Sequence, residues 1–266
     1  MKKLLLMFLS AFSIISCVDI ESADFEDEIY EPKELKVKSV FLKWIDDDYI
    51  NMVSTKTDYY YGANGYVSEI ESYEIQKEAE ERTTKNFYYT GNLIDSIVTN
   101  YEYKLTTGPN TGSEDNYRTV DRYYHNQNGL VTDYEHYSRG HKYYSDKYVY
   151  DTNDVLVSST RYNTPPLPQQ PTTSSGNYIY DTNKNILPTN FKSVKYDDKN
   201  FIYKNVYSPS LSKVMCISNN NFLFYIYNQY GRYHKFEYVY NKDLFPETKK
   251  VYEDEKLSYT ETISYY

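Results

Sequence analysis

The chain has 266 residues and a formal net charge of −9 at pH 7. This acidic balance argues against nucleic acid as a partner, because the sequence offers no basic stripe that could displace phosphate counterions. Tyrosine alone contributes 36 residues and alanine is scarce, so the composition favours pleated strands and predicts an almost entirely β protein.

Residues 1–16 are predicted to be an export signal. Lys2 and Lys3 precede an apolar run over residues 4–15, which is too short for a membrane span of about 20 residues. The run ends in Ile14-Ile15-Ser16-Cys17, which resembles the bacterial lipobox. We therefore expect lipid on Cys17 and a membrane as a partner through that lipid. An ordinary signal peptide followed by a coincidental cysteine is the alternative.

Residues 17–35 are predicted to be an acidic, flexible tether. Only Lys33 interrupts its carboxylates, which are Asp19, Glu21, Asp24, Glu26, Asp27, Glu28, Glu31 and Glu34. Such a segment cannot pack and stays solvated. An acidic stretch behind a lipidated cysteine also resembles the export signal of surface-displayed lipoproteins in Bacteroides-like bacteria. The expected location is the outer membrane at the cell surface, with the periplasmic face, or a plain linker, as the alternative.

Residues 36–266 are predicted to be a single all-β domain. Its one helical candidate is the stretch 70–82, which is rich in Glu and Lys. The apolar residues of this stretch stop at Ile75, too early for a continuous helical face. We therefore expect a strand followed by a polar loop. A second solvated loop is expected at Asp46-Asp47-Asp48, in preference to a carboxylate cluster for acid and base chemistry.

A local pattern then recurs along the chain: an aromatic pair, a short polar turn and an apolar strand that runs back. Tyrosines two residues apart project from the same side of a strand. The Asp or Asn after them starts a turn through its own backbone, and a later Gly or Asn accepts positive φ. Each copy therefore predicts a hairpin, and the copies cover residues 59–67, 88–94, 123–131, 148–156, 178–186, 225–232 and 238–244.

This pattern, Tyr-x-Tyr-Asp-x-x-Gly/Asn followed by apolar residues, resembles the YD repeat of rearrangement-hotspot proteins. A lipobox followed by such hairpins is similar to uncharacterised YD-repeat lipoproteins of Bacteroides-like bacteria. The stretch 196–206, followed by 218–221, also looks like a segment near the end of that family. The resemblance covers most of residues 50–255. It implies a sheet of successive hairpins and brings no catalytic residues to carry over.

The unequal spacing of the copies refines the expected architecture. Their second aromatic residues lie between 13 and 47 residues apart, which excludes a strict solenoid. We predict an antiparallel meander of successive hairpins, forming a large curled sheet or a soluble barrel-like shell. Its largest loop should span residues 163–176, where four prolines oppose ladder pairing.

A membrane barrel is the alternative architecture, because the last strand, residues 257–266, ends in aromatics. A lipid-facing band, however, needs apolar residues at every second position across most strands. The strands here carry charges on both faces, and the mean hydropathy is −0.77. A soluble shell is the preferred reading.

Candidates for chemistry are few. Asp181-Thr182-Asn183-Lys184-Asn185 resembles the opening of a calcium loop, but Ile186 stands in place of the needed glycine, so an Asx turn is expected. His136 and His141 lie near Asp133 and Glu135, where a metal site is the weaker reading and exposed histidines the preferred one. No metal or other cofactor is expected.

Cysteine usage adds one further expectation. Cys216 is the only cysteine besides Cys17, so no internal disulfide is possible once Cys17 carries lipid. Its apolar neighbours Val214, Met215 and Ile217 favour a buried, inert thiol over a reactive one.

The sequence therefore predicts a non-enzymatic binding or assembly protein whose ligand is a glycan, a peptide or a protein. No catalytic residue is expected. The alternative is an envelope hydrolase with scattered carboxylates on a β scaffold. Two carboxyl groups about 5 to 10 Å apart in a cleft would favour the hydrolase. An exposed aromatic strip without them would favour binding.

Overall fold

The computed structural model describes residues 34–45, 52–107, 111–164, 172–187, 191–215, 217–227 and 231–266. Within these ranges the chain forms fifteen strands and one short helix, and strands hold 65 % of the residues. The predicted all-β class is confirmed. Predictions for Cys17, for the tether up to residue 33, for Asp46-Asp47-Asp48, for Cys216 and for the proline-rich residues 165–171 fall outside the described residues.

The strands are long in the first half of the domain and shorter in the second. In chain order they are β1 (Val37–Trp44), β2 (Met52–Tyr61), β3 (Val67–Gln76), β4 (Ala79–Thr90), β5 (Leu93–Leu105), β6 (Glu114–His125), β7 (Val131–Ser138), β8 (His141–Tyr150), β9 (Leu156–Asn163), β10 (Thr172–Asn177), β11 (Phe191–Tyr196), β12 (Phe222–Tyr227), β13 (Tyr233–Tyr240), β14 (Pro246–Glu253) and β15 (Lys256–Tyr265), with helix α1 (Pro209–Val214) between β11 and β12. In the described part of the chain, no helix is long and apolar enough to cross a bilayer.

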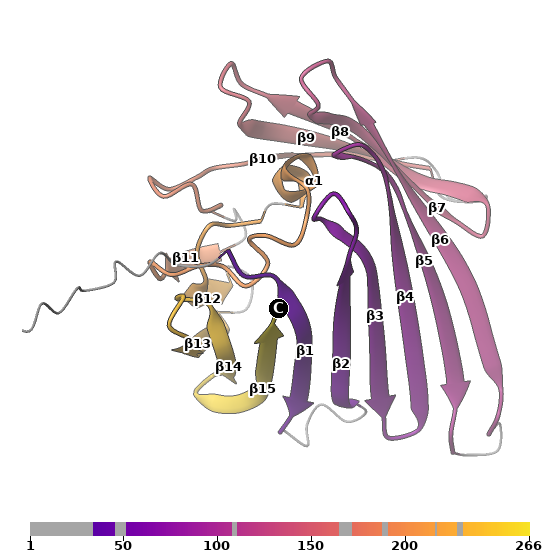
Figure 1. The fold of residues 1–266 in the computed structure, drawn as a ribbon, viewed down its shortest axis with the longest axis vertical. Helices are drawn as coiled ribbons and strands as arrows, with labels where there is room; N and C mark the ends of the chain where they lie inside the picture. The colour runs from indigo at the N-terminus through magenta and orange to yellow at the C-terminus, as the bar shows by residue number, and fades with distance from the viewer. Residues whose placement is uncertain are drawn as a thin grey trace, which may run out of the picture. The chain divides into compact units, whose positions relative to one another are not determined.

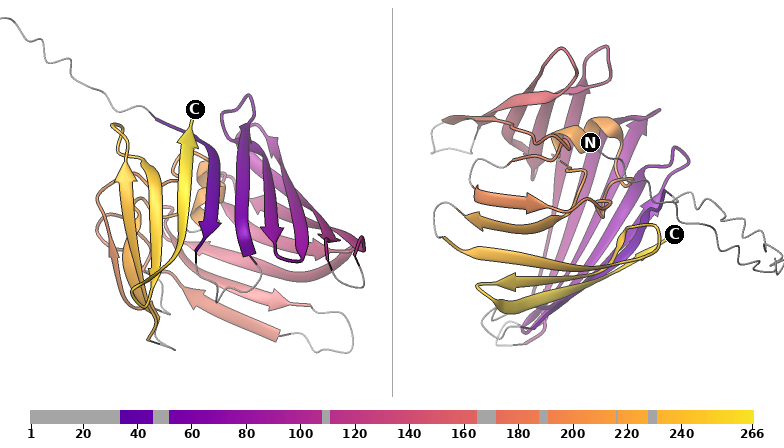
Figure 2. Two further views of the ribbon diagram at one scale, coloured as in Figure 1. Left: turned by 90° about the horizontal axis from the view of Figure 1, so that it is seen from below. Right: turned by 90° about the vertical axis from the view of Figure 1, so that its left-hand side faces the viewer.

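All fifteen strands belong to one antiparallel sheet, drawn in Figures 1 and 2, and its order is β10-β9-β8-β7-β6-β5-β4-β3-β2-β1-β15-β14-β13-β12-β11. The strands of the two ends of the domain pair directly, from Val37 opposite Tyr265 to Trp44 opposite Tyr259. The free edges are therefore β10 and β11, which follow one another in the chain. The predicted meander is confirmed, and the sheet curls without closing.

Two predicted loops are strands instead. Residues 79–82 begin β4, which pairs with β5 from Ala79 onward, and the Arg82 guanidinium lies 2.8 Å from the carboxylate of Glu71 on β3. Cross-strand pairing of this kind supports a polar strand that lacks apolar alternation. Likewise, β10 (Thr172–Asn177) begins inside the predicted loop 163–176 and pairs with β9 in unbroken register.

The hairpin turns form through the predicted side-chain contacts. Oδ1 of Asp151 accepts hydrogen bonds from the backbone N–H groups of Asn153 and Val155, at 2.8 and 2.9 Å. The residue before Val155, Asp154, has a φ of 60°. The same pair of bonds recurs at Asn126, Asp181 and Asn241. Only some turns place glycine at the positive-φ position, so the expectation of Gly or Asn there is too narrow: others use Asp154, Lys184 and Leu244.

Tyrosines at the ends of several strands tie their strand to a neighbouring segment of the chain. The hydroxyl of Tyr150 donates to the backbone carbonyl of Val131 at 2.8 Å. The equivalent bonds run from Tyr61 to Val37, from Tyr89 to Val67, from Tyr196 to Ile186 and from Tyr265 to Pro246. A net hydrogen bond of this kind is worth about 1 kcal/mol. Many tyrosines of the chain are therefore used to hold the sheet together.

Replacing Tyr150 by phenylalanine should lower the free energy of unfolding by about 1 kcal/mol, because the Val131 carbonyl loses its donor while ring packing is kept. Urea unfolding of the purified protein measures this as a lower midpoint at constant slope. Tyr124→Phe is the matched control, since Tyr124 is exposed and its hydroxyl bonds the carboxylate of Glu135 rather than a backbone carbonyl. Equal midpoints for the two variants would contradict the role of the buried bond.

In the described part of the chain, the segment between β11 and β12 packs against the apolar face of the sheet. Residues 197–215 and 217–221, which include α1, lie against this face, and α1 contacts β5 and β7 (Figure 1). Ile202, Val206 and Leu211 are buried in the same core cluster as Val67 and Val131. We call this segment the inner segment, the face that it covers the inner face, and the opposite one the outer face. The chain itself thus buries the apolar side that an isolated sheet would expose.

Candidate functional site

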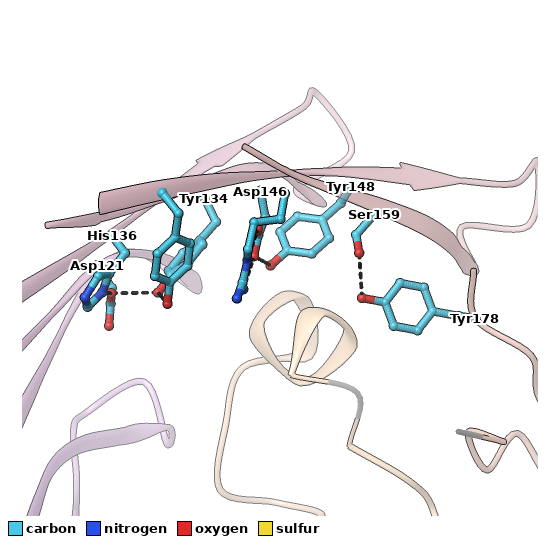
Figure 3. A network of polar contacts seen from close by, with 9 residues as sticks. Asp121, Tyr134, His136, Asp146, Tyr148, Ser159 and Tyr178 are labelled. Carbon is cyan, nitrogen blue, oxygen red and sulfur yellow. Dashed lines mark hydrogen bonds and ion pairs between the residues drawn. The ribbon is translucent and has the colours of Figure 1, made fainter. Parts of the chain in front are cut away.

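A line of polar and aromatic side chains crosses the inner face from β6 to β9 (Figure 3). We call it the inner polar row, and it consists of Asp121, Tyr134, His136, Tyr144, Asp146 and Arg161. Strand register brings it together, because Asp121 lies opposite His136, Tyr134 opposite Asp146, and Asp146 opposite Arg161. Facing residues of antiparallel strands point to the same side, so side chains distant in sequence become neighbours.

At one end of the row, Asp121 is held by two partners. Nδ1 of His136 and the hydroxyl of Tyr134, which donates, both lie 2.7 Å from its Oδ1. The His136 ring stacks on Tyr144 with 4.8 Å between ring centroids. Burial, followed by the charge of Asp121, raises the pKa of Tyr134. The phenol therefore stays protonated and acts as a donor.

At the other end, Asp146 and Arg161 form a two-point ion pair. Nε and Nη2 of Arg161 each donate to the Asp146 carboxylate at 2.8 Å, and the guanidinium lies 4.1 Å from the Tyr144 ring centroid. The hydrogen bonds with Asp146 raise the pKa of Arg161. Asp146 is buried, but the Arg161 side chain is 46 % exposed. Such fixed geometry holds a cationic, planar group at an accessible position.

The chemistry of the row suits recognition. Its carboxylates accept hydrogen bonds from neighbouring protein groups, so they orient those groups. The Arg161 guanidinium stays accessible to solvent and lies over the ring of Tyr144, on which His136 stacks. Aromatic surface combined with a few fixed polar groups is the usual lining of a binding site.

The histidines of the sequence analysis are not brought together. His136 belongs to the inner polar row, whereas His141 is exposed and lies opposite Ser138. Glu135 lies on the outer face, where it accepts hydrogen bonds from Tyr124, Tyr137 and Lys142. Burial would raise the pKa of Glu135, but these three bonds outweigh it and lower that pKa. Among the residues that the structure describes, no group of three or more His, Cys, Asp or Glu could hold a metal ion.

The calcium-like stretch forms an Asx turn, as the sequence predicts. Oδ1 of Asp181 accepts the N–H groups of Asn183 and Asn185, both at 2.8 Å. Its Oδ2 accepts the side-chain amide of Asn185 at 3.0 Å. Both carboxylate oxygens are therefore committed to the turn.

The outer face carries a second feature that follows the repeated pattern. In six of the seven copies the middle residue of the Tyr-x-Tyr-like pair is apolar or aromatic and 42 to 57 % exposed, whereas Ile226 of the copy 225–232 is half-buried. We call these six exposed residues the outer strip: Tyr60, Tyr88, Tyr124, Val149 and Val239 lie on strands of the sheet, and Ile179 lies just after β10. Three of the six are exposed tyrosines, and exposed aromatics are the feature that the sequence analysis associates with binding.

Sequence reasoning missed the inner polar row. Its signal was present as alternating polar and aromatic residues, for example Tyr134-x-His136 and Tyr144-x-Asp146. The turn at residues 126–130 sets the register that pairs Asp121 with His136. Extending the hairpin register outward from each turn would have found the row.

Comparison with known proteins identifies no family. No family model matches the sequence, and no curated protein matches it either. Among solved structures, the chain is similar to a porin-like protein from Bacteroides uniformis, with a TM-score of 0.38 and 8 % sequence identity over 86 % of this chain and 96 % of that one. A likeness this remote carries no argument about function.

Proposed function

We propose that this protein is a lipid-anchored, surface-displayed envelope protein whose β domain binds a glycan, peptide or protein ligand without catalysing a reaction. The inner polar row carries the binding part of the proposal, because it holds the Arg161 guanidinium at an accessible place beside the aromatic ring of Tyr144. The lipobox-like residues 14–17 and the acidic stretch behind them support the anchored and displayed location.

The geometry favours binding over hydrolysis. A hydrolase with two carboxylates needs one of them to give a proton to the substrate and the other to face the substrate or a water. In the row, Asp146 is held at two points by Arg161, and Asp121 accepts from Tyr134 beside His136. Both carboxylates are therefore used to position protein side chains.

The test replaces the Asp146–Arg161 pair as a unit. Changing Arg161 alone would leave a buried, unpaired carboxylate and threaten folding. The double variant Asp146→Leu/Arg161→Met removes the charges at similar volume, a change that is often neutral for stability. We expect recovery of the native ligand, captured on the intact lipoprotein from its own envelope, to fall about tenfold or more, because contacts to a charged group are lost.

The matched control lies on the opposite face of the neighbouring strands. Glu135→Leu/Lys142→Met removes an ion pair of 3.1 Å on the outer face and should leave ligand recovery unchanged. Equal recovery by both double variants would reject the inner polar row as the binding site. Hydrolysis of envelope glycans or peptides by the purified protein, lost in Asp121→Asn, would favour the enzymatic alternative.

A further inference from the structure

The two free edges of the sheet differ in how well they are protected. Strand β11 carries Lys192 and Lys195 and has two irregularities in its register with β12. Charges and bulges of this kind prevent further pairing. Strand β10, Thr-Thr-Ser-Ser-Gly-Asn, has no charge, and all six residues are exposed. It pairs with β9 without a register shift, so its outer edge is regular.

The pairing with β9 shows which backbone groups of β10 are free to pair again. The N–H of Tyr178 donates to the carbonyl of Val157 on the β9 side at 2.9 Å. Backbone groups alternate along a strand, so Thr172, Ser174 and Gly176 also face β9. The N–H and C=O groups of Thr173, Ser175 and Asn177 consequently point away from the sheet. In the described part of the chain, no strand lies beyond them.

The inner polar row leads to this edge. Arg161 lies opposite Ser174 of β10, and the hydroxyl of Ser159 lies 2.9 Å from that of Tyr178, directly after β10. A strand added beside β10 would place its inward side chains about one strand spacing, 4.7 to 4.9 Å, from Ser174. The β10 edge would supply hydrogen bonds to the backbone of the added strand. The inner polar row would contact the side chains of that strand.

We propose that β10 binds an extended segment of another polypeptide, which joins the sheet as an additional strand beside Thr173, Ser175 and Asn177. This inference rests on the proposed binding function and narrows its ligand to a polypeptide. Backbone donors and acceptors that repeat every second residue match another extended backbone, and the small side chains of β10 leave room for its approach. A glycan has no such repeat.

The test selects ligands from a phage library of random linear peptides and measures the binding of the recovered peptide. Ser175→Pro removes one outward N–H at the centre of the edge and leaves the groups that face β9 in place. We expect binding to weaken about tenfold or more in this variant. Ser175→Thr is the matched control, which keeps the N–H and should bind normally.

Amide hydrogen exchange of the unaltered protein, with and without the peptide, is a second measurement that does not depend on the folding of a variant. The peptide should slow exchange at the amides of Thr173, Ser175 and Asn177. Unchanged exchange at these amides, or a library that yields no peptide, would overturn strand addition. Strand addition by another polypeptide would also be overturned if the protein associates with itself and Ser175→Pro abolishes this association. The strand beside β10 would then come from a second copy of the protein. Loss of native ligand only in Asp146→Leu/Arg161→Met would retain the proposed function and reject the role of β10.

Discussion

Replacing Leu211 by alanine is expected to lower the free energy of unfolding by about 2 to 5 kcal/mol, the usual cost of emptying a buried leucine site. Leu211 is 0 % exposed and lies on α1, in the core cluster that joins the inner segment to the sheet. A domain has only about 5 to 15 kcal/mol of stability in total. Because α1 contacts β5 and β7, the cavity would loosen the contact that covers the apolar face.

Denaturant unfolding of the purified protein measures this loss. The control is Met215→Ala, four residues further on, where the side chain is 44 % exposed and a change of less than about 0.5 kcal/mol is expected. If Leu211→Ala costs no more than this control, the inner segment does not stabilise the sheet. Exposure of apolar surface, detected by dye binding in Leu211→Ala alone, would support its role as the cover.

Local features of the fold could be predicted because their causes are local. An Asp or Asn after a tyrosine pair starts a turn through hydrogen bonds within four residues, as Asp151 and Asp181 do. The hairpins, and hence the antiparallel meander, follow from these short contacts. The error at residues 79–82 arose because an apolar alternation was required of a strand. β4 is held instead by its long ladder and by polar pairs such as Arg82 with Glu71.

Features that depend on distant parts of the chain could not be predicted. The pairing of β1 with β15 joins residues more than 200 positions apart, and no local signal marks either strand as the partner of the other. The same holds for Leu211, whose burial depends on a sheet built from the rest of the domain. The inner polar row lies between these cases, since each hairpin register is local but its common face emerges only from four strands together.

Changing Cys17 to alanine should release the protein from the membrane fraction and abolish its metabolic labelling with palmitate. Each buried CH₂ of an acyl chain contributes about 0.8 kcal/mol, so two or more chains keep a protein on the membrane for long times. Without these chains, nearly all of the protein should leave the membrane. Cys216→Ala is the matched control and should keep both the label and the membrane association. Continued labelling of Cys17→Ala would end the lipoprotein interpretation.

Under the proposed function, the protein should also be accessible from outside the cell. The sequence predicts a flexible tether, and a flexible chain as long as the sixteen residues 19–34 would span roughly 20 to 25 Å, enough to lift the domain clear of the headgroups. A non-penetrating protease should therefore remove the protein from intact cells. Replacing the acidic residues of the stretch 19–28 with alanine should make it resistant, because it would be retained inside while Cys17 still carries lipid. If the unaltered protein is protected in intact cells and cleaved only after the envelope is opened, it faces the periplasm. Surface display is then rejected, and the proposed ligand would have to be periplasmic.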